Sequence, residues 1–400
     1  MATSVDESWD AVVVGGGPAG AATAALLAAR RWSVLVIDKA RFPRDKACAE
    51  FASPGVEIVL RRLGAWEAVQ ALQPRRLRGM QLIGPSGERF AGTYPRGRAI
   101  ALPRPQLDQA VLDVARKRGA TVWENTRVHD LLREGQRVSG VVAAAGRGAV
   151  RHVGARLVVG ADGLHSTVAR RTDAIRPGWW PHRTGLVTHC EGIDGLDTLA
   201  SYGEMHVRPG AYVGLAPLPG GCVNVAMVLP TRAVRQRGQD VEGLFWHELA
   251  QFPALAGRLA RVRRTKSLLG TGPLRRHVPV TAGPGYLLVG DAAGFLDPFT
   301  GEGIYRALRG AELAAAAADA ALRTPAEADA ALAEYCRARQ SAFRPKEALC
   351  LLVQAFIAYP PLLEYALRRL RRRPRLAQRL FGALGDTHSP WATLAALLRP

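Results

Sequence analysis

Residues 290–304 of this chain read GDAAGFLDPFTGEGI, and no other stretch constrains the architecture as strongly. The apolar run 286–289 comes directly before it, so the pattern predicts a buried strand, a tight glycine turn and the N-terminus of a helix. A second stretch of the same kind, GGGPAG at 15–20, lies near the other end of the chain. Two such turns, about 275 residues apart (290 minus 15), indicate one long ligand that is held at both ends.

The N-terminal turn carries the spacing expected of a dinucleotide site. Gly15, Gly17 and Gly20 satisfy G-x-G-x-x-G between an apolar strand and a helix. The first glycine permits the tight turn, the second lets the backbone approach a pyrophosphate, and the third lets helix and strand pack closely. The N-terminus of the helix then offers free N–H groups to the phosphates. Asp38 ends the next strand, where a carboxylate accepts the hydroxyls of an adenosine ribose.

The periodicity beyond this unit separates two kinds of dinucleotide. An NAD-dependent dehydrogenase would continue in regular βα units, whereas residues 176–274 alternate like an antiparallel sheet before the buried pattern returns. The predicted cofactor is therefore FAD. We expect an α/β fold: a Rossmann-type βαβ FAD-binding domain, an interleaved antiparallel-sheet substrate domain and a helical C-terminal region. The expected ranges are 9–76, 99–175 and 275–325 for the FAD-binding domain, 77–98 and 176–274 for the substrate-binding domain, and 326–400 for the helical region.

The amino-acid composition limits the kinds of binding partner that are expected. Lys and Arg number 54 against 34 Asp and Glu, which gives a formal net charge of +20. Such a chain attracts anions, but no helix-turn-helix, zinc-finger or RNA-recognition pattern is present, so no nucleic-acid partner is expected. The five cysteines lack paired spacing, so neither a metal site nor a disulfide framework is indicated. The acidic start, 1–10, lacks an apolar run, so we expect a cytoplasmic protein, with membrane association left open.

Four motifs in chain order resemble the glutathione-reductase-type FAD proteins, in the branch of aromatic hydroxylases, geranylgeranyl reductases and flavin halogenases. They are the two glycine turns, Arg104 before a helix, and the pair Asp162 and Gly163. The resemblance implies that Arg104 reaches the FAD phosphates and that Asp162 and Gly163 help to shape the FAD and NAD(P)H sites. It also implies that Asp291 hydrogen-bonds the ribityl chain, and that the helix after Pro298 lies under the flavin pyrimidine edge. The positions expected to hold FAD are Gly15, Gly17, Pro18, Ala19, Gly20, Asp38, Lys39, Arg104, Val128, Asp162, Gly163, Gly290, Asp291, Pro298, Gly301, Gly303 and Ile304.

Local motifs separate the members of this branch. Aromatic hydroxylases usually carry a histidine after GDAA and an asparagine-bearing turn further on. Here Gly294 stands in place of the histidine, and the turn 301–304 contains Glu302 and no asparagine. The loop 45–54, DKACAEFASP, is similar to the DKxCGxxxSP loop of the geranylgeranyl reductases, with Ala49 in place of the usual glycine. Halogenases carry a W-x-W-x-I-P segment, which GWWP at 178–181 does not match, so halogenation is not expected.

The substrate pocket is predicted from the same resemblance. The reductases carry a Y-x-W-x-F-P strand, and residues 212–217 keep its tyrosine and proline but replace both large rings with small residues. This change widens the pocket beside the flavin. The pocket residues are expected to be Cys48, Tyr212, Gly214, Ala216, Pro217 and Phe299. Cys48 is also the candidate catalytic group, as a proton donor, although a single cysteine is more often a small buried apolar residue.

Three functions remain open on the sequence. The favoured one is an NAD(P)H- and O2-dependent monooxygenase for a bulky hydrophobic aromatic, polyketide or phenolic-lipid substrate. The alternative is a reductase that saturates isoprenoid double bonds, and the third is a basic, membrane-associated FAD-binding protein without turnover. No second G-x-G-x-x-G unit exists, so NAD(P)H would bind transiently or a partner reductase would supply the electrons.

The stretch 361–379 places leucines at helical spacing with arginines between them. It is expected to form one helix, for which two interpretations stay open. The helix lies on an anionic membrane, or its apolar side covers the domain while the arginines are solvated.

Overall fold

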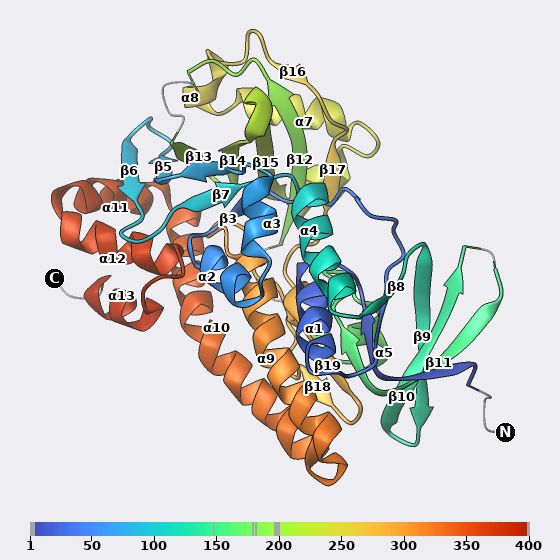
Figure 1. The fold of residues 1–400 in the computed structure, drawn as a ribbon. Coiled ribbons are helices and arrows are strands. Elements are labelled where there is room, and N and C mark those ends of the chain that lie inside the picture. The colour runs from blue at the N-terminus through green and yellow to red at the C-terminus, as the bar shows by residue number, and fades with distance from the viewer. Residues whose placement is uncertain (1–4, 147, 178–179, 181, 196–200, 398–400) are drawn as a thin grey trace.

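The computed structural model describes residues 5–146, 148–177, 180, 182–195 and 201–397 (Figure 1). Its first sheet has the strand order β18-β19-β11-β1-β2-β8, with β10 paired to both β11 and β9. The central strands are parallel, and the segments that pair at the centre, such as residues 11–14 of β1 and Val34–Ile37 of β2, are apolar and buried because both of their faces are covered. The strands are β1 (Glu7–Val14), β2 (Val34–Ile37), β8 (Thr121–Trp123), β9 (Thr126–Glu134), β10 (Arg137–Ala145), β11 (Val150–Gly160), β18 (Ala282–Gly283) and β19 (Tyr286–Leu288).

Helices cover one face of this sheet, and the β9–β10 hairpin with a short helix covers the other. The first layer packs closely because α1 and α9 meet through alanines such as Ala21 and Ala311, which have no exposed surface. The covering helices are α1 (Pro18–Ala28), α2 (Gly55–Arg62), α3 (Trp66–Ala71), α4 (Arg104–Lys117) and α9 (Gly303–Arg323), and the short helix is α5 (Thr167–Arg171).

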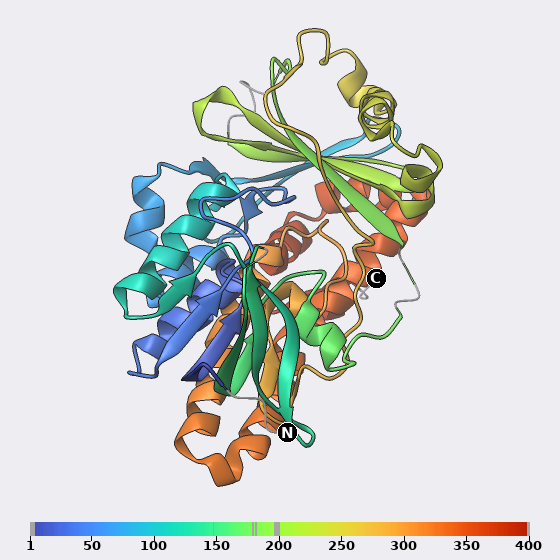
Figure 2. The same cartoon turned by 90° about the vertical axis from the view of Figure 1, so that its right-hand side faces the viewer.

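A second, largely antiparallel sheet lies across the top of the molecule (Figure 2). Its order is β16-β12-β15-β14-β13-β5-β6, with β17 beside β12, and β5 joins β13 in parallel. The strands are β5 (Gly79–Ile83), β6 (Arg89–Thr93), β12 (Arg183–Glu191), β13 (Tyr202–Arg208), β14 (Ala211–Pro217), β15 (Val223–Pro230), β16 (Arg263–Arg264) and β17 (Leu269–Thr271). The helices α6 (Thr231–Gln236), α7 (Val241–Ala250) and α8 (Pro253–Ala256) follow β15, and α7 and α8 pack on its outer face. A small sheet of β3 (Phe51–Ala52), β7 (Ala99–Ala101) and β4 (Arg75–Leu77) connects the two layers.

The C-terminal helices close the inner face of the second sheet. They are α10 (Ala328–Ala358), α11 (Pro360–Arg372), α12 (Pro374–Leu384) and α13 (Pro390–Leu397). The prediction of one helix over 361–379 is wrong, because the chain breaks at Arg373 before Pro374, where proline disfavours a helical preceding residue. Among the described residues, no single helix is long and apolar enough to cross a bilayer. The pair 325–358 and 360–372, bent by 116°, meets the length and composition criteria together.

This architecture confirms the predicted fold class: a Rossmann-type α/β layer, an interleaved antiparallel sheet and a helical C-terminal region. The exact ranges of the three regions stay predictions. Residues 178, 179 and 181 of the GWWP stretch lie outside the described residues.

Candidate active site

The two glycine turns meet in space, although they are distant in sequence. A Cβ added at Gly20 would lie 1.8 Å from the Gly15 carbonyl oxygen, and one at Gly15 would lie 2.5 Å from the Ala161 oxygen. Gly290 has φ +63°, and a Cβ there would lie 2.9 Å from the Ala19 Cβ. Only glycine fits these positions, so the ends of β1, β11 and β19 converge on the start of α1.

Two helix N-termini at this point lack a capping side chain. The N-cap of α1 is Gly17, which has no side chain, and that of α9 is Glu302, whose side chain accepts no hydrogen bond from its helix. Open space surrounds the Cα of Gly303, where an added Cβ would meet nothing within 4 Å, while Ile304 behind it is buried. Uncapped N–H groups facing open space are suited to an anionic ligand.

Asp38 is fixed at the end of β2 by backbone donors. Its Oδ2 accepts from Gly16 N at 2.7 Å, and its Oδ1 accepts from Ala40 N at 2.8 Å. The neighbouring Lys39 is exposed. Val128 lies on β9 with a buried side chain, so only its backbone could contact a ligand.

Arg104 does not project freely toward the glycine turn. It is 4% exposed and makes two 2.7 Å bonds to the Asp108 carboxylate, from Nε to Oδ1 and from Nη2 to Oδ2. Burial alone would lower the pKa of Arg104, but the carboxylate outweighs it and raises this pKa. Arg44 also pairs with Asp108, at 3.0 Å, and its Nη2 would lie 3.2 Å from a Cβ on Gly17. Arg44, which sequence reasoning missed, is therefore the guanidinium beside the turn.

Lys46 joins two of the predicted motifs. Its Nζ lies 3.3 Å from Asp291 Oδ2, and it is the closest atom to a Cβ built on Gly163. The Asp162 carboxylate accepts from Thr167 N at 2.6 Å and from the Ser166 hydroxyl, so it fixes the start of α5. Burial raises the pKa of Asp162.

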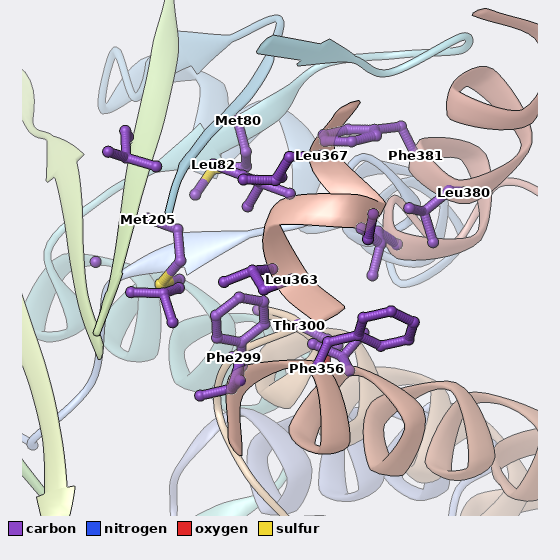
Figure 3. Close-up of a pocket in the computed structure, with 18 of the residues that line it drawn as sticks. Met80, Leu82, Met205, Phe299, Thr300, Phe356, Leu363, Leu367, Leu380 and Phe381 are labelled. Carbon is purple, nitrogen blue, oxygen red and sulfur yellow. The ribbon is translucent and has the colours of Figure 1, made fainter. Parts of the chain in front are cut away.

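A cavity of about 250 Å³ lies between the second sheet and the C-terminal helices (Figure 3). Gly214 and Ala216 of β14 line it together with Pro298, Phe299 and Gly301 from the turn before α9. Most of the other walls are long apolar side chains, which include Phe51, Met80, Leu82, Met205, Leu349, Phe356, Leu363, Leu367, Leu380 and Phe381. Ala49, from the loop before β3, also reaches it.

Three of the six predicted pocket residues do not line this cavity. Tyr212 turns its hydroxyl to the buried Asp297, with a 2.5 Å bond to Oδ1, so burial and this carboxylate raise its pKa. Pro217 is buried at the end of β14. Cys48 lies beside the Arg104 guanidinium, and its sulfur accepts from Glu50 N at 3.3 Å.

A polar cluster that sequence reasoning missed lies behind Ala49. The Glu50 Oε2 is 2.6 Å from His189 Nε2 and accepts from Asn224 Nδ2 at 3.1 Å. Burial lowers the pKa of His189, but the Cys222 thiol and the Glu50 carboxylate outweigh it and raise this pKa to about 9. His189 therefore carries a proton at neutral pH. Asn224 comes from β15 and Glu50 from the loop before β3, so no local signal in the sequence indicates the cluster.

Comparisons with known proteins agree with this geometry. A family described as FAD binding domain matches residues 8–188. Menaquinone reductase of Mycolicibacterium smegmatis is 31% identical over 322 residues, which cover 76% of this chain and 75% of that protein. Digeranylgeranylglycerophospholipid reductase 2 of Methanothermobacter thermautotrophicus is 30% identical over 321 residues, 79% of each. A flavin-dependent brominase shares the fold with a TM-score of 0.85 at 20% identity, covering 98% of both chains. The chain therefore belongs to this family of FAD-dependent oxidoreductases.

The described residues also fit FAD chemically. Gly15 and Gly20 allow the turn and the start of α1 to pack tightly, because a Cβ on either would collide with a backbone oxygen, and Gly17 presents no side chain to an approaching pyrophosphate. Arg44 supplies a positive charge beside it, and Asp38 supplies a fixed carboxylate at the ribose position of such folds.

Proposed function

We propose that this protein is an FAD-dependent reductase that adds hydrogen across a double bond of a bulky, isoprenoid-bearing substrate. The apolar cavity carries the proposal. Two of the relatives are named for menaquinone and for digeranylgeranylglycerophospholipid, and both of these molecules bear isoprenoid chains. These names support the substrate class without defining the substrate.

The character of the cavity walls favours such a chain over a small polar molecule. Glu204 is among the few polar residues that line it, and its carboxylate is already bound by His206 at 2.7 Å and Arg258 at 2.7 Å. Small-molecule sites normally carry polar groups that fix the orientation of a polar ligand. The side chains of this cavity instead offer dispersion contacts and exclude water.

The chain itself would supply a proton and an apolar cavity, while bound FAD would supply the hydride. His189 is protonated at neutral pH and is held by Glu50, which adjoins the cavity-lining Ala49. We therefore assign His189 the role of holding the proton that the product needs. NAD(P)H, bound transiently or through a partner reductase, is the proposed source of electrons.

Oxygenation of a bulky hydrophobic aromatic, polyketide or phenolic-lipid substrate is the second candidate. Gly214 and Ala216 line the cavity where the geranylgeranyl reductases carry large rings, so the site is wide enough for a compact ring system. Sequence reasoning alone favoured this chemistry. We nevertheless prefer the reductase, because α10–α12 add apolar side chains that an isoprenoid chain would contact.

Product mass separates the two reactions. FAD-loaded protein, reduced with dithionite under anaerobic conditions, is incubated with a menaquinone that bears a short isoprenoid tail. Because dithionite also reduces the quinone ring, the extracted product is first reoxidised to the quinone. Reduction of the chain then predicts products heavier by about 2 mass units per double bond without oxygen. Oxygenation predicts no carbon-chain product until labelled O2 is admitted and its label is found in the product. If FAD-loaded protein forms neither kind of product with several isoprenoid and aromatic probes, the proposed function is contradicted.

A further inference from the structure

The outer surface of α11 exposes large apolar side chains. Tyr359, just before the helix, is 66% exposed, and Leu362 and Tyr365 are 41% and 53% exposed. Leu362 and Tyr365 are three residues apart, so they lie on the same side of the helix. Tyrosine rings with one apolar and one polar end are favoured at membrane–water interfaces.

This surface adjoins an opening of the apolar cavity. Tyr365 and Arg369 line the cavity and are themselves partly exposed. Across from them, the cavity-lining Val353 and Phe356 of α10 are half-buried. The cavity therefore reaches solvent between α10 and α11, and it is also lined by the turn 298–301 before α9.

Positive charge surrounds the same helix. Arg368 and Arg372 of α11 and Arg373 after it are exposed, and no ion pair holds them in the part of the chain that the structure describes. Arg371 is different, because it lies 2.6 Å from Glu88. Buried Leu363, together with Leu367 and Leu370, faces inward. The helix thus has an inner apolar stripe that covers the cavity and an outer surface that combines aromatic groups with unpaired arginines.

We propose that α11 seats the cavity opening on an anionic lipid bilayer, so that a membrane-dissolved substrate enters the cavity without crossing water. Arginines would attract the acidic headgroups, and Leu362 with the two tyrosines would enter the interfacial layer. The lipid-surface contact stands on the exposed groups of α11. The passage of a substrate through it rests on the proposed function.

Vesicle binding tests the contact without turnover. Full-length, FAD-loaded protein is sedimented with two kinds of vesicle. One contains phosphatidylcholine alone, and the other also contains about 30% phosphatidylglycerol, which gives the vesicle a strong negative surface charge. We expect binding to the anionic vesicles only. The double variant Arg368→Gln/Arg372→Gln should bind about 30-fold more weakly, from about 1 kcal/mol per basic residue. Leu362→Ser/Tyr365→Ser should also bind about 10-fold more weakly at unchanged charge.

A matched control removes the same charge elsewhere. Arg235 and Arg237 are exposed on and just after α6, which packs on β12 and β15, whereas α11 packs on β6 at the other edge of the sheet. Arg235→Gln/Arg237→Gln should bind vesicles like the unmodified protein. Equal loss in this control would overturn the proposal in favour of general attraction to polyanions. Wild-type binding by the Leu362 and Tyr365 variant, or no binding to anionic vesicles at all, would overturn it too.

The same variants separate this inference from the proposed function. With a probe dispersed in detergent, the Arg368→Gln/Arg372→Gln variant, whose changed residues do not line the cavity, should turn over at the unmodified rate, and with the probe embedded in vesicles it should be slower. Vesicle binding by a protein that reduces no probe would leave the contact standing and remove the proposed function.

Discussion

Gly20→Ala is expected to weaken FAD binding through a displacement that the structure defines. The added Cβ would lie 1.8 Å from the Gly15 oxygen, whereas real Cβ atoms essentially never approach closer than 3.0 Å, so the turn must shift by about 1.2 Å (3.0 minus 1.8). Overpacking of this kind costs about 1–3 kcal/mol, which the better helix propensity of alanine offsets by about 1 kcal/mol.

The cost should fall on the bound state. Without FAD the turn at Gly15 can relax, but a bound pyrophosphate requires the turn in its original position. The gain in helix propensity is the same with and without FAD, so the overpacking cost of about 1–3 kcal/mol sets the loss of affinity. Since about 1.4 kcal/mol corresponds to a tenfold weaker Kd, we expect a decrease in affinity of about 5- to 140-fold. The assay is titration of the apoprotein with FAD, followed by flavin fluorescence, together with thermal unfolding with and without FAD.

Gly257→Ala is the matched control for this prediction. Gly257 follows α8 with φ −75°, and an added Cβ would meet nothing within 4 Å. This variant should bind FAD normally. Unchanged FAD affinity in Gly20→Ala, with a correctly folded protein, would refute the steric reasoning for the glycine turn.

Three further perturbations follow from the site. Ala366→Trp should fill part of the cavity and weaken the binding of a geranylgeraniol probe about 10-fold or more while FAD affinity stays unchanged, which equilibrium binding measures. Asp108→Asn should lower the free energy of unfolding by about 3–5 kcal/mol in urea titrations, because the buried Arg104 would lose its charged partner; a loss below about 1 kcal/mol would contradict this pairing. His189→Gln should remove a pH-dependent stabilisation, because the pKa of His189 is raised to about 9 from about 6.5 in the unfolded chain. The stabilisation is complete below about pH 6.5 and disappears as pH rises through about 9. We expect a difference of about 1–2 kcal/mol between wild type and variant at pH 6, after allowance for partial solvent access, that shrinks by pH 9.5; a pH-independent difference would contradict the Glu50–His189 pairing.

The cofactor turns could be predicted from sequence because their requirements are local. Gly15, Gly20 and Gly290 each occupy a position where any side chain would collide with a neighbouring turn, and that steric demand appears as a spacing. Asp38 is similar, because its position is set by the strand that it ends. The fold class followed from the same logic, since buried parallel strands and alternating strands differ in periodicity.

The cavity could be predicted only in part because it is made by tertiary packing. Gly214, Ala216 and Phe299 line it, but most of its apolar wall comes from α10–α12, whose leucines carry no mark of which surface they face. Tyr212 shows the same limit. Its ring lies on the inner face of the sheet, yet its hydroxyl is bonded to Asp297, a partner 85 residues away.

The ion-pair partners of the charged side chains could not be predicted from the sequence either. Arg104 could be located before a helix, but its pairing with Asp108 and the resulting role of Arg44 depend on how the loop before β3 folds back. The break between α11 and α12 had a local signal in Pro374, which the leucine spacing outweighed in the prediction.

The most direct test of the central claim is whether the apolar cavity and the FAD site form one active site. Geranylgeraniol is titrated into FAD-loaded protein while the flavin absorbance band at about 450 nm is recorded. The occupancy of the cavity by geranylgeraniol is measured separately by equilibrium binding. We expect a saturable change in the flavin spectrum that follows occupancy and is lost in Ala366→Trp. A flavin spectrum that does not change at full occupancy, or a chain that binds no FAD, would contradict it.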